Sequence, residues 1–62
     1  MYQLRVFHPD RPSATEILHI TRAADVLNAI PTLLEKHADC ARIEVWGVDA
    51  RLFAVDCQGN RL

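Results

Sequence analysis

The side chains of this chain that could bind a metal are its three histidines, its two cysteines and the carboxylates near them. These candidate ligands are His8, Asp10, His19, His37, Cys40, Asp56 and Cys57. A zinc site needs three or four converging donors, and only His37 and Cys40 share a short spacing. The remaining candidates fall on separate predicted strands and faces. We therefore expect no metal and no cofactor, and we interpret His37 as a histidine at the negative end of a helix dipole.

Nucleophilic catalysis needs a serine or cysteine beside a base that a carboxylate orients. No histidine has such neighbours along the chain, and the carboxylates occur singly. A phosphate-binding loop is not expected either, because the two glycines, Gly47 and Gly59, occupy predicted hairpin positions. The sequence therefore predicts a protein that is not an enzyme.

An aromatic and basic platform is the one pattern that favours nucleic-acid binding. Phe7, Trp46, Arg5 and Arg42 are predicted to share a sheet face on which bases could stack. However, seven Lys and Arg residues against eight Asp and Glu residues give a formal net charge of −1. Three carboxylates are predicted on the same face: Glu16, Glu44 and Asp56. We therefore expect no nucleic-acid affinity tighter than about 0.1 mM at physiological salt.

Alternating apolar and polar residues predict the four strands that would position these side chains. Two prolines within four residues, Pro9 and Pro12, end the first strand because each removes a hydrogen-bond donor from the ladder. The predicted strands are Tyr2–Phe7, Glu16–Ile20, Ala41–Gly47 and Arg51–Cys57.

One amphipathic helix is predicted between the second and third strands, over about Arg22 to His37. Its apolar residues repeat at a spacing of three and four, and Thr21 is the predicted N-cap. Pro31 should kink this helix or split it. The apolar stripe keeps its phase across Pro31, which favours one kinked helix.

Pleat parity sets the expected register of the last hairpin. Val45 should face Phe53, Ile43 should face Val55, Trp46 should face Leu52 and Arg42 should face Asp56, with Gly47 opposite Arg51 around a three-residue loop. This register places Cys57 opposite Ala41, so that Cys40 lies one residue away on the opposite side of the pleat. A disulfide would then need a rearrangement. We expect both thiols to be free.

These elements predict a single α+β domain over residues 1–62, with the order ββαββ. One helix covers only one face of a four-stranded, mainly antiparallel sheet. If the strands on either side of the helix were parallel neighbours, their connection should be a right-handed crossover. The second face of the sheet should be open.

The open face is the predicted interaction surface. Its assigned members are Phe7, Leu18, Ile20, Arg42, Trp46 and Leu52. Such an apolar cluster is larger than a soluble monomer usually exposes, which predicts a homodimer formed through this face or through a strand edge. Two alternatives stay open: the C-terminal tail or the proline-containing loop covers the face, or the parity of the second strand is wrong.

The remaining sequence features indicate a class of protein and no specific function. No apolar run is long enough to span a membrane, and no signal peptide is evident. We expect a cytoplasmic protein of bacterial or phage origin. Its predicted role is that of a non-enzymatic interaction module whose protein partner the sequence does not identify. The alternative is a small nucleic-acid-associated or phage-type regulatory protein.

Overall fold

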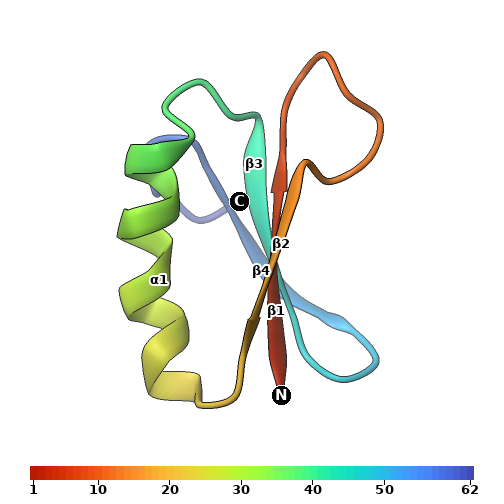
Figure 1. Cartoon of the computed structure of the whole chain (residues 1–62), viewed down its shortest axis with the longest axis vertical. Helices are drawn as coiled ribbons and strands as arrows, with labels where there is room; N and C mark the ends of the chain where they lie inside the picture. Colours follow the sequence, from red (N-terminus) through yellow and green to blue (C-terminus); the bar gives the residue numbers. More distant parts are fainter.

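The computed structural model describes all residues, Met1 to Leu62, and confirms the ββαββ order. Its strands are β1 (Tyr2–Phe7), β2 (Glu16–Ile20), β3 (Arg42–Trp46) and β4 (Arg51–Asp56), and its one helix is α1 (Ala23–Lys36). Figure 1 shows the helix lying against one face of the sheet, so the predicted α+β architecture is confirmed. No helix is long and apolar enough to cross a membrane.

The sheet has the order β2-β1-β3-β4, and every neighbouring pair is antiparallel. β2 and β3 both run against β1, so they are parallel to each other with β1 between them. The connection through α1 therefore passes over β1 and does not join neighbouring strands (Figure 1). The sequence predicts a right-handed crossover only if β2 and β3 are neighbours. They are not neighbours, so that prediction does not apply.

The core lies between α1 and the two central strands. Leu4, Val6, Ile43 and Val45 are at most 1% exposed, and α1 adds its buried residues Val26, Ile30 and Leu33. Burying one such side chain contributes about 1.5 to 3 kcal/mol. The alternation of β1 and β3 thus places their most apolar residues under the helix.

The N-cap of α1 lies one residue after Thr21, the predicted N-cap. Arg22 is the N-cap, with an extended backbone (φ −111°, ψ 136°) and no side-chain capping bond. Thr21 therefore lies outside the first turn, and its prediction as the N-cap is wrong. Pro31 sits inside one continuous helix, which agrees with the choice of one helix over two.

The last hairpin keeps the predicted register up to Val45 and then departs from it. Val45 faces Phe53, but a β-bulge follows and Trp46 faces Arg51. The Gly47 amide donates to the Ala50 carbonyl at 2.8 Å, so the loop closes more tightly than predicted. The pairings of Trp46 with Leu52 and of Gly47 with Arg51 are therefore wrong.

Cys40 and Cys57 form a disulfide, with their Cα atoms 5.5 Å apart. This overturns the expectation of two free thiols. Cys40 precedes β3 and Cys57 follows β4, so neither residue is held by the pleat on which that expectation depends. The disulfide joins the loop after α1 to the end of β4.

The C-terminal tail continues the sheet beyond β4. Arg61 forms an antiparallel bridge with Val55, and the Leu62 amide donates to the Ala54 carbonyl at 2.9 Å. Gly59 makes the turn between them with a positive φ of 86°, a conformation that glycine adopts without strain. The tail therefore covers the edge of β4 and not the open face, while the outer edge of β2 has no partner strand.

Candidate functional sites

The predicted interaction surface is divided between the two faces of the sheet. Phe7, Arg42 and Trp46 lie on the open face, as predicted, because their register neighbours Gln3, Arg5 and Glu44 lie there too. Leu18 faces Leu4 and Ile20 faces Tyr2, so both lie on the helix side, where they are partly buried against the core. Their assignment to the open face is wrong. The loop between β1 and β2 sets this register, and its residues carry no pattern from which the register could be predicted.

Leu52 also leaves the open face. The bulge after Val45 inserts it as the extra residue between two paired positions of β4. Its side chain lines an apolar hollow with Tyr2, Val26 and Leu27 on the helix side. The prediction that Leu52 lies on the open face is therefore wrong, although 54% of the residue stays exposed.

Two arginines cover the aromatic rings of the open face. The Arg5 guanidinium lies 4.2 Å from the Trp46 ring centroid, and that of Arg42 lies 4.0 Å from the Phe7 centroid. Gln3 Oε1 accepts hydrogen bonds from Arg5 Nε and Nη2 at 3.0 and 2.9 Å. Such cation–π pairs contribute about 0.5 to 1 kcal/mol at exposed sites. The open face is therefore a network of charged and aromatic side chains and not a bare apolar patch.

Glu44 is the buried carboxylate of this network, and it is 6% exposed. It accepts hydrogen bonds from Arg42 Nε at 2.8 Å and from Trp46 Nε1 at 3.0 Å, and Arg51 Nη1 lies 3.6 Å away. Burial raises the pKa of Glu44, but the bonds from Arg42 and Trp46 outweigh it, so the net pKa lies below the ordinary value. A charged Glu44 thus holds the neighbouring side chains in place.

The sequence predicts three carboxylates on this face that would repel nucleic acid. One of them lies on the helix side instead, and another accepts hydrogen bonds from backbone amides. Glu16 faces Val6 and lies on the helix side. Asp56 accepts the backbone amides of Asn60 and Gln58, each at 2.9 Å. The amide of Asn60 is the main cause that lowers the pKa of Asp56. Asp56 remains on the open face, opposite Arg42, so only the move of Glu16 removes a negative charge that the sequence predicts there.

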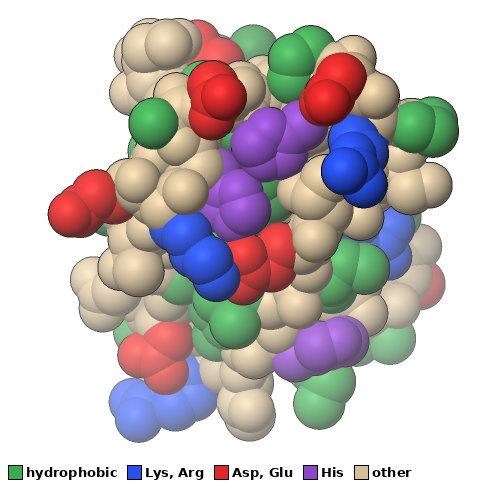
Figure 2. All heavy atoms as spheres, turned by 45° about the horizontal axis from the view of Figure 1, so that its top comes forward, with side chains coloured by type: hydrophobic (Ala, Val, Ile, Leu, Met, Phe, Trp, Pro, Cys, Tyr) green, Lys and Arg blue, Asp and Glu red, His purple; other side chains and the backbone are tan.

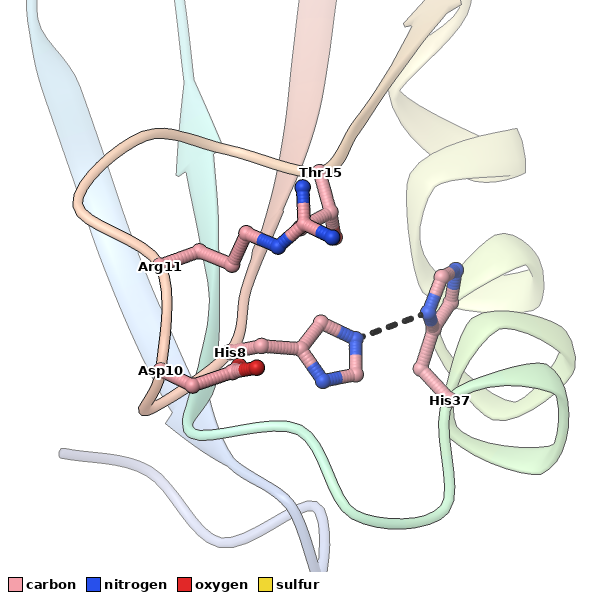
Figure 3. Close-up of a pocket in the computed structure, with 5 residues that line it drawn as sticks. All are labelled: His8, Asp10, Arg11, Thr15 and His37. Atoms are coloured by element: carbon pink, nitrogen blue, oxygen red, sulfur yellow. Dashed lines mark hydrogen bonds between the residues drawn. The ribbon is translucent and has the colours of Figure 1, made fainter.

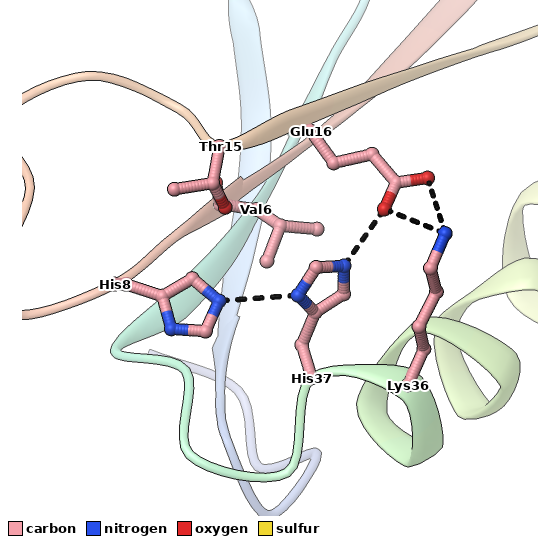
Figure 4. Close-up of polar contacts among 6 residues, drawn as sticks. All are labelled: Val6, His8, Thr15, Glu16, Lys36 and His37. Carbon is pink, nitrogen blue, oxygen red and sulfur yellow. Dashed lines mark hydrogen bonds and ion pairs between the residues drawn. The ribbon is translucent and has the colours of Figure 1, made fainter.

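A second cluster, which the sequence does not predict, joins His8, His37 and Glu16; we call it the histidine relay. His8 Nε2 lies 3.1 Å from His37 Nδ1, and His37 Nε2 lies 2.7 Å from Glu16 Oε1 (Figure 4). Lys36 Nζ adds an ion pair to Glu16 at 3.1 Å. Figure 2 shows two histidine side chains touching at the surface, with acidic and basic groups around them.

Three separate elements build the histidine relay. His8 follows the end of β1, Glu16 begins β2 and His37 is the C-cap of α1. The hydrogen bond from His37, followed by that from Lys36, lowers the pKa of Glu16. Spacing along the chain carries no sign of this site, because His8 and His37 are 29 residues apart. Predicted parity also puts Glu16 on the open face, away from the end of the helix.

When both imidazoles are neutral, the hydrogen-bond chain assigns one tautomer to each ring. Ionised Glu16 only accepts, so His37 Nε2 carries the hydrogen and His37 Nδ1 accepts from His8 Nε2–H. His8 Nδ1 is then left with a free lone pair. A hollow of about 400 Å³ adjoins this ring (Figure 3). Its lining has no apolar residue: His8, Asp10, Arg11, Thr15 and His37.

An apolar groove lies on the helix side between α1 and β4. Two adjoining hollows that share Leu27 and Phe53 form it. The first is lined only by apolar residues, and the second also contains Arg61, whose guanidinium lies 4.5 Å from the Phe53 centroid. Leu27 is 66% exposed at this groove. Leu27 and Leu52 thus expose apolar surface on the helix side, whereas the exposed Ile17 lies opposite Arg5 on the open face.

Comparison with known proteins gives no relative. No protein-family model matches the chain. No curated protein and no solved structure matches it either. Functional inference therefore depends on the open face, the histidine relay and the apolar groove.

Proposed function

We propose that this protein is a non-enzymatic binding module that forms a homodimer through the apolar groove. The observation that carries the proposal is the exposure of Leu27 (66%) and Leu52 (54%) beside an all-apolar hollow. A projecting leucine next to an apolar hollow is self-complementary, as a two-fold interface requires. Small domains with a thin core commonly gain stability by such pairing. This replaces the open face with the helix side as the dimer surface.

Sedimentation velocity over a dilution series tests the dimer. We expect a dimer at micromolar concentration, and a shift towards monomer in Leu27→Glu and Leu52→Asp. Val48→Asp is the matched control, because Val48 is apolar and 88% exposed but lies outside the groove. A monomer at hundreds of micromolar, or equal weakening by Val48→Asp, would refute this interface.

The alternative proposal is a small nucleic-acid-associated or phage-type regulatory protein that uses the open face. Three arginines lie on this face: Arg42 and Arg51 pair with the carboxylate of Glu44, and Arg5 lies opposite Glu44 in the register. Single strands bind platforms of this kind through stacking and phosphate contacts. A base would have to displace the guanidinium groups that already lie on Phe7 and Trp46, or stack on them. The dependence of oligonucleotide affinity on salt decides this alternative.

The proposed cytoplasmic location affects the expected redox state of the disulfide. Cytoplasmic thiols are normally kept reduced, and disulfides persist in oxidising compartments. We therefore expect Cys40 and Cys57 to be reduced in the cytoplasm and to form their disulfide on oxidation. Rapid acid quenching and thiol alkylation of intact cells measure the redox state directly. A fully oxidised pair in growing cells would refute the cytoplasmic location.

A further inference from the structure

We propose that the polar hollow beside the histidine relay binds a small tetrahedral oxyanion, of the phosphate class, and that binding is accompanied by proton uptake at His8. The site goes beyond the dimer proposal, because the hollow lies at the loop between β1 and β2 and the groove lies between α1 and β4.

Two side chains supply the donors for the anion. Arg11 extends from the loop into the hollow, and its guanidinium lies beside Thr15, on the same side of the hollow as that residue (Figure 3). A guanidinium offers paired N–H groups that match two oxygens of a phosphate. Protonated His8 is the second donor. Thr15 forms part of the wall and is not a free donor, because its hydroxyl donates to the Val6 carbonyl at 3.3 Å.

Charge explains why the proton is needed. Within the hollow the carboxylate of Asp10 offsets the guanidinium of Arg11, so with neutral His8 the hollow carries no net positive charge. A proton on His8 Nδ1 makes the site cationic and converts a lone pair into a second donor. The anion is therefore bound in the imidazolium state.

The relay stabilises that imidazolium from behind. Protonated His8 still donates from Nε2 to His37, which donates to the carboxylate of Glu16. The carboxylate of Glu16, at the far end of this series of hydrogen bonds, thus compensates the positive charge on His8. Lys36, on α1, is paired with the same carboxylate and weakens this compensation without removing it. Bound anion and proton consequently favour each other, as linkage requires.

Titration with sulfate, inorganic phosphate and acetate, followed by NMR of the histidine ring nitrogens, tests the proposal. Sulfate keeps its charge over the pH range used, so a pH effect on its affinity belongs to the protein. With ionic strength held constant by sodium chloride, we expect sulfate to bind roughly tenfold more tightly at about pH 6 than at about pH 8, the range in which histidines titrate. Phosphate should also bind and shift the His8 resonances, and acetate should bind more weakly than either.

Variants distinguish the site from general surface attraction. Arg11→Gln and His8→Gln should each weaken sulfate binding at least about tenfold at about pH 6. Glu16→Gln should reduce the pH dependence, and circular dichroism confirms that each variant is folded. His19→Gln is the control, because His19 is an exposed histidine on the open face, opposite Gln3.

The proposal fails if sulfate leaves the His8 resonances unchanged, if affinity does not rise at low pH, or if folded Arg11→Gln binds as tightly as the natural sequence. Tight binding of acetate with none of sulfate would also overturn the tetrahedral class. The Leu52→Asp variant should retain sulfate binding, so failure of the dimer interface and failure of this site are separate results.

Discussion

The imidazole of His37, at the end of α1, donates from Nε2 to Glu16 Oε1, at the start of β2, across 2.7 Å. This bond fastens the helix end to an edge strand whose sole neighbour in the sheet is β1. It also places an acceptor-only carboxylate at one end of the histidine relay. Titratable groups thus add to the apolar packing that already joins α1 to β2.

Replacing Glu16 by Gln should make stability less dependent on acid. The pKa of Glu16 is lowered in the folded state from an ordinary value of 4.5. A lowered folded pKa means that the stabilisation is present above about pH 4.5 and is lost as the pH falls through the folded pKa. Urea unfolding from neutral pH down to about pH 3 should therefore show a shallower decline for Glu16→Gln than for the natural sequence. An identical slope would contradict the assignment.

Replacing Glu44 by Ala should destabilise the open face. Arg42 and Trp46 would lose their buried acceptor, at a cost of about 1 to 3 kcal/mol. Urea unfolding monitored by Trp46 fluorescence measures it. Glu44→Gln is the matched variant, because it keeps an acceptor without the charge, and it should cost less than Glu44→Ala. A cost below that of Asp49→Ala, a loop carboxylate with no ion pair, would contradict this role.

Reducing the disulfide should lower stability without abolishing the fold. Cys40 and Cys57 are 17 residues apart. In the chain-entropy model, closing a loop of that size stabilises the folded state by about 3 kcal/mol. The melting temperature should fall in reductant, and the Cys40→Ser/Cys57→Ser variant should show the lower value in both conditions. An unchanged melting temperature in reductant would contradict a stabilising bond.

Element order and strand positions can be predicted from the sequence because burial imposes alternation locally. Leu4 and Val6 under the helix follow directly from the pattern of β1. The face of β2 cannot be predicted, since the pattern Glu-Ile-Leu-His-Ile alternates imperfectly and the preceding loop sets its register. The position of Leu52 escapes prediction for a similar reason, because a bulge shifts parity by one residue.

The functional clusters are harder to predict because they join distant segments. His8 and His37 meet only after β1, β2 and α1 have packed. Parity places Phe7, Arg42 and Trp46 correctly, since β1 and β3 both have buried faces that fix their outward residues. Parity is thus reliable where one face of a strand is fully buried and weak at an edge strand.

Salt dependence tests the nucleic-acid alternative, which uses the open face. If Arg5, Arg42 and Trp46 bind single strands, log affinity should fall against log salt by about 0.7 per phosphate neutralised. Trp46→Ala should then cost roughly 1 to 3 kcal/mol of binding. The net charge of −1 leads us to expect affinity no tighter than about 0.1 mM at physiological salt. Titration of labelled oligonucleotides measures both quantities, with Leu52→Asp as a control on the opposite side of the sheet. Micromolar binding that Trp46→Ala abolishes and Leu52→Asp preserves would make nucleic-acid recognition the leading function, because only the open face would then carry the affinity.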